Sequence, residues 1–199
     1  MSINSAGIIN ESSGGTTVVE DWEGSTPLSN WSGDTGGVGV GNYNRYEGSR
    51  SVQAPSSDYS VLITKDGTDY GPADTPFSVY IHNRDTYQTA GIAFGGQNNN
   101  GYGGFSGYAA TYSPDYLYLY RYDSGSRTRL GSSFETTLTE FRIVLSEWKS
   151  DGSMTAEVRD LNGNVTDTLS TTDGTHGSGR VGVRFGDSCT SDYLTVNGV

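Results

Sequence analysis

The sequence has little cysteine and lysine and no long hydrophobic run, and these absences exclude several classes of protein. Cys189 is the single cysteine, which excludes an intrachain disulfide and leaves packing or a bound metal to hold the framework. No stretch approaches the roughly 18 apolar residues of a membrane-spanning helix, so we expect no membrane insertion. The N-terminal MSINSAGIIN has neither a basic start nor an apolar run, and we therefore expect no secretory signal there.

Basic residues are scarce relative to acidic ones. The chain has 12 Lys and Arg against 23 Asp and Glu, a formal net charge of −11, and this balance argues against a nucleic-acid or anionic-membrane surface. Only Lys65 and Lys149 are lysines. An acid-rich, lysine-poor surface is typical of proteins that work in molar salt, where repulsion is screened within about 3 Å. The alternative is an ordinary acidic protein.

The residues that are abundant favour short strands over helices. The 199 residues suffice for one domain and include 29 glycines and 14 tyrosines. Apolar and polar residues alternate with a period of two in four segments, the signature of antiparallel strands that bury one face. These segments span residues 77–82, 141–146, 154–159 and 180–185.

Turn signals separate the segments. They are the pairs Asp66-Gly67, Asp151-Gly152, Asn162-Gly163 and Asp173-Gly174, in which the first residue tolerates a left-handed conformation and the second lacks a Cβ atom. Each strand then has one apolar face to bury, and a second sheet covers it. We predict an all-β domain over residues 17–199 made of two packed antiparallel sheets.

Sequence landmarks follow one another in a characteristic order. The opening has Trp22-Glu23-Gly24 and then Trp31, followed by YEGSRSVQA from Tyr46 to Ala54. The later landmarks are GIAFGG, LYLYRYDSG, TEFRIVLSEW, AEVRDLNGNVTDTL and SGRVGVRFGDSCTSDYLTV. Over about Thr17 to Val199 this order resembles the concanavalin A-like jelly roll of laminin G-like domains, lectins, carbohydrate-binding modules and virion surface proteins. The resemblance implies the fold, while the fold itself hosts many functions.

The resemblance also implies a structural calcium site. In many such domains a Glu of the first strand and an Asp of the last strand bind Ca²⁺ together with backbone carbonyls of a glycine-containing loop. The matching positions are Glu23 and Asp192, with carbonyls near Tyr46 and Glu47 and with Asp21 as an additional ligand. Ca²⁺ takes about six to eight oxygen ligands. The alternative is that these carboxylates are solvated like the other acidic side chains.

A row of tyrosines is the strongest candidate for a binding surface. Period-two geometry places four of them on one strand face and Leu117 and Leu119 on the other. Amphipathic rings of this kind can stack on sugars and donate hydrogen bonds. The alternatives are a half-exposed strand or a contact with a neighbouring subunit. The tyrosines are Tyr116, Tyr118, Tyr120 and Tyr122, and the residues expected to share their face are Tyr80, His82, Arg142 and Arg184.

A second candidate is the loop of residues 97–107, rich in Gly and Asn, which carries Tyr102. Loops of this composition on a rigid sandwich often carry binding specificity. A plain flexible connection is the interpretation that we favour at this point.

The sequence offers little for catalysis. No strand has the Glu-x-Asp-x-Glu pattern of related glucanases, and the two histidines, His82 and His176, have no convincing Ser or Cys partner. We expect Cys189 to be a small buried residue. These features favour a non-enzymatic module over the alternative of a carbohydrate-active enzyme domain, related to glycosidases or lyases.

Residues 1–16 form an N-terminal arm of small polar residues around Ile3, Ile8 and Ile9. Burying three isoleucines at about 1.5–3 kcal/mol each does not offset an ordering cost of about 1–2 kcal/mol per residue. We expect the arm to lie against a partner, either in a homo-oligomer, for which we favour a trimer, or on another virion protein. An arm packed on its own domain is the alternative.

The expected lack of a secretory signal, the N-terminal arm and the acid-rich composition together predict a biological setting. We expect a virion component, such as a capsid turret, decoration or tail-fibre protein, of a virus that infects a salt-loving archaeon. At the virion surface it would contact host glycans. A free secreted lectin is the other alternative.

Overall fold

The computed structural model describes residues 16–54, 61–71, 77–82, 89–98, 100–113, 115–134, 138, 140–186 and 189–197. In this part of the chain every regular element is a β-strand except the short 3-10 helix η1 (Thr35–Gly37). Every strand pairing is antiparallel. The prediction of an all-β, two-sheet jelly-roll sandwich is confirmed. Residues 1–15 of the expected arm lie outside the described residues.

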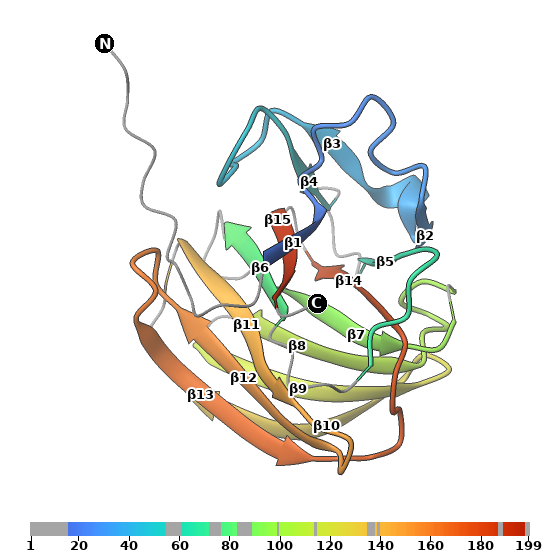
Figure 1. Ribbon diagram of the computed structural model, residues 1–199, viewed down its shortest axis with the longest axis vertical. Coiled ribbons are helices and arrows are strands. Elements are labelled where there is room, and N and C mark those ends of the chain that lie inside the picture. Colours follow the sequence, from blue (N-terminus) through green and yellow to red (C-terminus); the bar gives the residue numbers. More distant parts are fainter. Residues whose placement is uncertain are drawn as a thin grey trace.

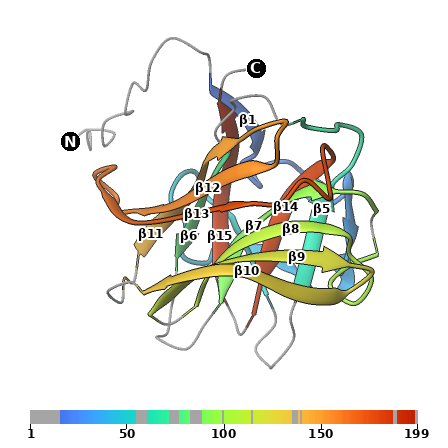
Figure 2. The same ribbon diagram turned by 90° about the horizontal axis from the view of Figure 1, so that it is seen from below.

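The strands form two sheets that lie as two layers (Figures 1 and 2). The seven-stranded sheet runs in the order β10 (Ser126–Phe134), β9 (Tyr116–Asp123), β8 (Gly107–Ser113), β7 (Ala90–Gly96), β14 (Arg180–Phe185), β5 (Val61–Lys65) and β2 (Trp31–Gly33).

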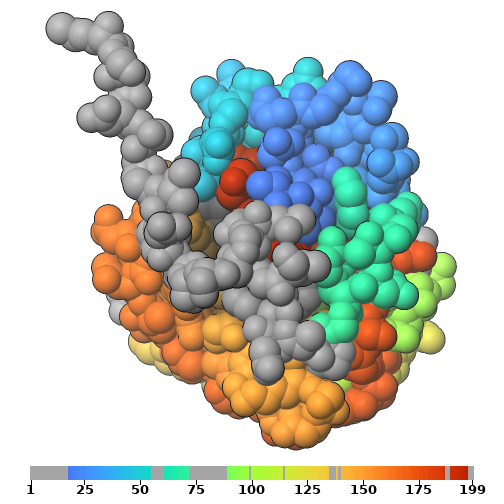
Figure 3. Space-filling model, in the orientation of Figure 1, coloured from blue at the N-terminus to red at the C-terminus, as the bar shows by residue number. Residues whose placement is uncertain are grey.

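The eight-stranded sheet runs in the order β13 (Val165–Thr172), β12 (Ser153–Arg159), β11 (Glu140–Trp148), β6 (Phe77–His82), β15 (Thr190–Asn197), β4 (Ser51–Gln53) and β3 (Gly39–Gly41). β1 (Thr16–Glu20) pairs with β15, so the last strand lies beside the first. Residues between β1 and β4 gather at one end of the molecule, in blue and cyan in Figures 1 and 3.

The buried residues of the core lie at the positions that the alternation in the sequence predicts. Phe141, Ile143 and Leu145 of β11 are fully buried, whereas Arg142 between them is partly exposed. β12 shows the same alternation. β6 forms the expected strand, but its side chains are outside the described residues. On β14 even the outward-facing Arg184 is buried, because the loop that carries Tyr102 covers it.

Large aromatic residues fill the space between the sheets. The Trp22 and Trp31 rings lie 4.8 Å apart, and Trp148 packs edge-on against Phe94 at 5.3 Å. Cys189 is a small, fully buried residue within the same core, as expected. The Asp151-Gly152 and Asn162-Gly163 turns join β11 to β12 and β12 to β13, and both glycines have a positive φ, of 85° and 87°. Only glycine adopts that conformation without strain.

Candidate functional site

The tyrosine row lies on the outer face of the seven-stranded sheet. Leu117 and Leu119 are fully buried in the core between the sheets, so the alternate residues of β9 point away from it. Tyr116 is exposed, and Tyr118 and Tyr120 are partly exposed. The predicted division of β9 into a leucine face and a tyrosine face is therefore present in the structure.

The exposed rings stack on one another. Ring centroids of Tyr116 and Tyr118 are 5.6 Å apart with planes at 29°, and those of Tyr118 and Tyr120 are 5.4 Å apart at 23°. Phe134 meets Tyr116 edge-on at 5.5 Å. Because neighbouring rings cover much of each other's faces, the row offers ring edges and hydroxyl groups to a ligand. Of the two expected contacts, hydrogen bonding to sugar hydroxyls and stacking on sugar rings, this arrangement favours hydrogen bonding.

The fourth tyrosine of β9 is covered. Tyr122 is fully buried, with Tyr102 at 5.8 Å and Phe105 at 5.7 Å, both edge-on. Arg184 is only 5% exposed, and its guanidinium lies 5.3 Å from the centre of the Tyr102 ring. The expectation that Tyr122 and Arg184 are open to a ligand is wrong for this structure, because the loop that carries Tyr102 and Phe105 folds over this end of the sheet.

Hydrogen bonds hold that loop in place. Asp34 Oδ2 accepts hydrogen bonds from the backbone N–H of Tyr102 at 2.7 Å and of Leu62 at 3.0 Å. The Asn98 side-chain amide donates to the Gly104 carbonyl at 3.0 Å. A Cβ atom on Gly101 would lie 2.2 Å from Asp34 Oδ1, which explains glycine there. The favoured interpretation of this loop as a plain flexible connection is wrong for its described residues.

Two arginines that the sequence analysis missed complete the tyrosine face. On β10, Arg127 pairs with Tyr122 and Arg129 pairs with Tyr120. Both arginines are exposed, and the Arg127 guanidinium lies 4.5 Å from the centre of the Tyr120 ring. The signal was the Ser124-Gly125 turn, which makes β9 and β10 a hairpin and sets Arg-Thr-Arg opposite Tyr-Arg-Tyr.

The hydroxyls of Tyr120 and Tyr122 remain protonated in this environment. Burial raises the pKa of Tyr120, although the charge of Arg127 acts in the opposite direction. Burial also raises the pKa of Tyr122, against the effect of Arg184. A raised pKa keeps both hydroxyls as donors over the physiological pH range.

The other residues expected on this face belong to the opposite sheet. Arg142 is on β11, and Tyr80 and His82 are on β6, both in the eight-stranded sheet. Arg142 stacks on Tyr46, with its guanidinium 4.6 Å from the ring centre. The expectation of one shared face is therefore wrong, because alternation identifies the buried side of a strand but not its sheet.

The candidate calcium residues meet around the loop of residues 45–50. Asp192 is 1% exposed, and its Oδ2 accepts hydrogen bonds from the N–H groups of Tyr46 at 2.8 Å and Glu47 at 3.0 Å. Glu23 accepts two bonds from Ser49, both at 2.6 Å. The Asp21 carboxylate accepts the Glu23 N–H at 3.1 Å. Tyr46 and Glu47 thus present amide N–H groups, not the expected carbonyls, to Asp192.

One oxygen of this cluster fits a cation. Asp192 Oδ1 is buried and has no hydrogen-bond partner among the described residues. Burial raises the pKa of Asp192 to about 6, and the nearby charge of Glu23 acts in the same direction. Within the described ranges, however, no group of three or more His, Cys, Asp or Glu comes together as a metal site. Any ion here would have two carboxylates and need backbone or water oxygens as further ligands.

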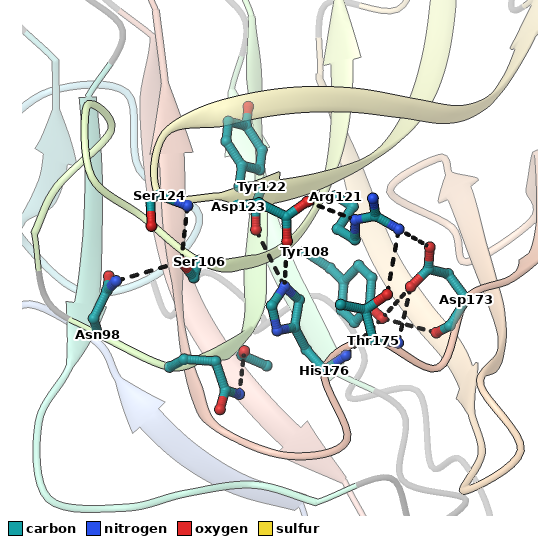
Figure 4. A network of polar contacts seen from close by, with 12 residues as sticks. Asn98, Ser106, Tyr108, Arg121, Tyr122, Asp123, Ser124, Asp173, Thr175 and His176 are labelled. Carbon is teal, nitrogen blue, oxygen red and sulfur yellow. Dashed lines mark hydrogen bonds and ion pairs between the residues drawn. The ribbon is translucent and has the colours of Figure 1, made fainter.

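A separate polar network joins the segment between β13 and β14 to the start of β8 and the end of β9 (Figure 4). The Tyr108 hydroxyl lies 2.8 Å from Asp173 Oδ1, and Arg121 forms an ion pair with Asp173 at 2.7 Å. The His176 N–H donates to the Tyr108 oxygen, and His176 Nε2 lies 3.1 Å from the Tyr122 carbonyl. These contacts fix the segment between β13 and β14 against the seven-stranded sheet, so we assign the network a structural role.

No described helix is long or apolar enough to cross a membrane. Neither the family models nor the curated proteins that were compared match the sequence.

Solved structures do match, and they define the fold. A carbohydrate-binding module, CBM66 from Bacillus subtilis, is 12% identical with a TM-score of 0.60 over 81% of this chain and 95% of its own. The mannose- and Ca²⁺-bound VIP36 exoplasmic/lumenal domain is 9% identical with a TM-score of 0.62 over 92% and 89%. A Bacillus subtilis protein of unknown function with a galectin-like fold is 10% identical with a TM-score of 0.59 over 92% and 98%. The chain has the concanavalin A-like jelly-roll fold of lectin-type domains, as the sequence landmarks predicted.

Proposed function

We propose that the chain is a non-enzymatic glycan-binding module whose contact surface is the outer face of the seven-stranded sheet. The observation that carries the proposal is the exposed, mutually stacked row of Tyr116, Tyr118 and Tyr120. Stacking fixes the rings before a ligand arrives, which lowers the entropic cost of binding. Their hydroxyls, carried by alternate residues of one strand, suit the many hydroxyl groups of a saccharide.

Two further observations support this proposal. The similar structures include a carbohydrate-binding module and a domain with mannose bound, so the same sandwich supports sugar binding elsewhere. The strands of the seven-stranded sheet contain one acidic residue, Asp123. The strands of this sheet thus lack the pair of carboxylates that glycoside hydrolysis requires, and this supports binding without catalysis.

Removal of single hydroxyl groups tests the proposal. Tyr118→Phe and Tyr120→Phe keep the stacked rings and remove the hydroxyls. Tyr43→Phe is the matched control, because the Tyr43 ring lies against β3 of the eight-stranded sheet. On a glycan panel, we expect about two- to tenfold weaker binding for the first two variants, the equivalent of one hydrogen bond each, and no change for the control. Equal binding by all three variants contradicts the assigned surface, and turnover of a bound glycan assigns the chain to the carbohydrate-active enzymes instead.

We also propose a structural Ca²⁺ held by Asp192 Oδ1 and Glu23. The unpartnered buried oxygen of Asp192 supports this proposal, as do the Ca²⁺-bound forms among the similar structures. The ion would offset the repulsion of two nearby carboxylates and tie the first strand region to the last strand. We expect a chelator to lower the melting temperature of the wild type but not that of Glu23→Gln; a chelator effect of equal size in both contradicts the site.

For the biological setting we propose a salt-adapted virion component that is displayed at the virion surface as a homo-oligomer, with a trimer favoured. The acid-rich, lysine-poor composition supports the salt adaptation. Removing residues 1–15 leaves β1 intact and should give a folded monomer that no longer assembles, as measured by analytical ultracentrifugation. An unchanged oligomer after the deletion contradicts a role of the arm in assembly.

A further inference from the structure

Charge is divided unequally between the two sheets. The strands of the seven-stranded sheet carry six basic residues and one acidic residue, whereas those of the eight-stranded sheet carry two basic and six acidic residues. The six basic residues are half of the 12 in the chain. They are Lys65, Arg121, Arg127, Arg129, Arg180 and Arg184. In a chain of net charge −11, one sheet is therefore basic.

Most of these cations have partners within the protein. Lys65 pairs with Glu20 at 2.5 Å, and Arg180 pairs with Asp66 at 3.4 Å. Arg121 is held by Asp123 and Asp173, and Arg184 is buried beneath Tyr102.

The remaining two cations are Arg127 and Arg129. Both are exposed, and among the described residues neither forms an ion pair with a carboxylate. The uncompensated positive charge of the sheet is therefore concentrated on β10.

These two cations lie beside the tyrosine row. Arg127 and Arg129 are two residues apart on one strand, so they share the outer face and are spaced by about 6–7 Å along it. Their cross-strand partners are Tyr122 and Tyr120. The contact of the Arg127 guanidinium with the Tyr120 ring, at 4.5 Å, orients the guanidinium while leaving its edge N–H groups for an anion.

We propose that this face selects acidic polysaccharides, whose sugar units carry carboxylate or sulfate groups. Arg127 and Arg129 bind successive anionic groups, since the planar guanidinium forms paired hydrogen bonds with either anion. The tyrosine hydroxyls bind the sugar hydroxyls in between. This inference rests on the proposed function and assigns its ligand class. Single-stranded nucleic acid is disfavoured, because its bases bind by stacking on aromatic ring faces, and the faces in this row contact neighbouring rings and Arg127.

Matched ligands test the inference. Polygalacturonate and its methyl ester share one backbone and differ in charge, and dextran sulfate and dextran form a second such pair. Titration calorimetry with the wild type should show at least about tenfold tighter binding of the charged member of at least one pair. That factor corresponds to about 1.4 kcal/mol, just below the range of about 1.5–3 kcal/mol for one hydrogen bond to a charged group. The pair that shows the preference distinguishes carboxylate from sulfate recognition.

Variants separate this inference from the proposed function. Arg127→Gln/Arg129→Gln should lose the preference for the charged ligand, whereas Arg159→Gln, which removes a cation from the other sheet, should retain it. All three substitutions leave the core untouched, and thermal melting checks that folding is intact. A preference retained by the double variant, or equal wild-type binding of charged and neutral ligands, overturns acidic selectivity. If the wild type in that case still binds the neutral glycans through Tyr118, the proposed function stands.

Two other outcomes count against the proposal. Binding of no glycan at all overturns both the ligand class and the proposed function. Equally tight binding of single-stranded DNA with the same number of charges shows a general polyanion site and overturns the polysaccharide assignment.

Discussion

The Arg127 guanidinium lies 4.5 Å from the centre of the Tyr120 ring, across the β9–β10 strand pair. The two residues are diagonal rather than direct partners, since Arg127 pairs with Tyr122 and Arg129 with Tyr120. This diagonal contact joins the two features of the candidate site, the hydroxyl row and the exposed cations. It also helps to hold the half-exposed Tyr120 ring in place. A cation–π contact at an exposed site contributes about 0.5–1 kcal/mol of stabilisation.

Truncation of a side chain should lower the free energy of unfolding far more on the inner face of β9 than on its outer face. Leu117→Ala removes a fully buried side chain and should lower the free energy of unfolding by about 2–5 kcal/mol. Tyr118→Ala on the outer face should cost about 1 kcal/mol or less while weakening glycan binding. Urea unfolding of both variants measures the difference. Similar losses for the two variants contradict the division of the strand.

The sequence predicted the faces of strands better than their positions. Phe141, Ile143 and Leu145 were identifiable as core because a period-two pattern reports burial directly. The same pattern did not show that Arg142 is in a different sheet from Tyr118, because sheet membership depends on long-range strand pairing. Landmark order, in contrast, predicted the jelly roll.

The sequence could not predict the covering of Tyr122 and Arg184. Their burial depends on Tyr102, and the position of Tyr102 depends on a hydrogen bond to Asp34, 68 residues earlier in the chain. No local pattern encodes such a contact. Arg127 and Arg129 were within reach of sequence reasoning, since the turn after Asp123 fixes the hairpin register that places them opposite the tyrosines.

Asp34 should control the loop over the outer face. Asp34→Ala leaves the backbone N–H groups of Leu62 and Tyr102 without their acceptor, so we expect the free energy of unfolding to fall by about 1–3 kcal/mol. Asp34→Asn keeps one acceptor oxygen and should lose less. We also expect faster hydrogen exchange at Tyr102 in the alanine variant. If exchange at Tyr102 is unchanged, Asp34 does not hold the loop.

Asp173 should make stability depend on acidic pH. Burial acts to raise its pKa, but hydrogen bonds from Thr175, Tyr108 and Arg121 outweigh burial and lower the pKa to about 2. A carboxyl group with a lowered folded-state pKa stabilises the fold above its unfolded pKa, near 3.8, and loses that contribution as the pH falls through about 2. The contribution is about 2 kcal/mol at neutral pH.

Comparison with Asp173→Asn isolates this contribution. The wild type should be more stable than the variant at pH 6, and the difference should shrink by about 2 kcal/mol between pH 4 and pH 2. Chemical unfolding at a series of pH values measures it. Tyr108→Phe serves as a control, because it removes one hydrogen bond to Asp173 and keeps the ion pair with Arg121. Curves for the wild type and Asp173→Asn that run parallel down to pH 2 contradict the lowered pKa.

Salt should stabilise the fold steeply. The eight-stranded sheet carries most of the strand acids, and the chain as a whole has a net charge of −11, so like charges lie close together on one side of the sandwich. At about 0.01 M salt the Debye length is roughly 30 Å, longer than the spacing of these charges, whereas at 1 M it is roughly 3 Å. Repulsion between carboxylates should therefore weaken the fold at low salt and disappear at high salt.

We expect the urea midpoint of unfolding to rise substantially between 0.05 M and 3 M NaCl, because urea adds no charge of its own. Sucrose, which strengthens apolar burial without screening charge, is the control for effects unrelated to screening. If the midpoints in 0.05 M and 3 M NaCl are equal, the acidic surface is not an adaptation to salt. A rise that sucrose reproduces in full leads to the same conclusion, because it attributes the stabilisation to apolar burial instead of screened repulsion between carboxylates.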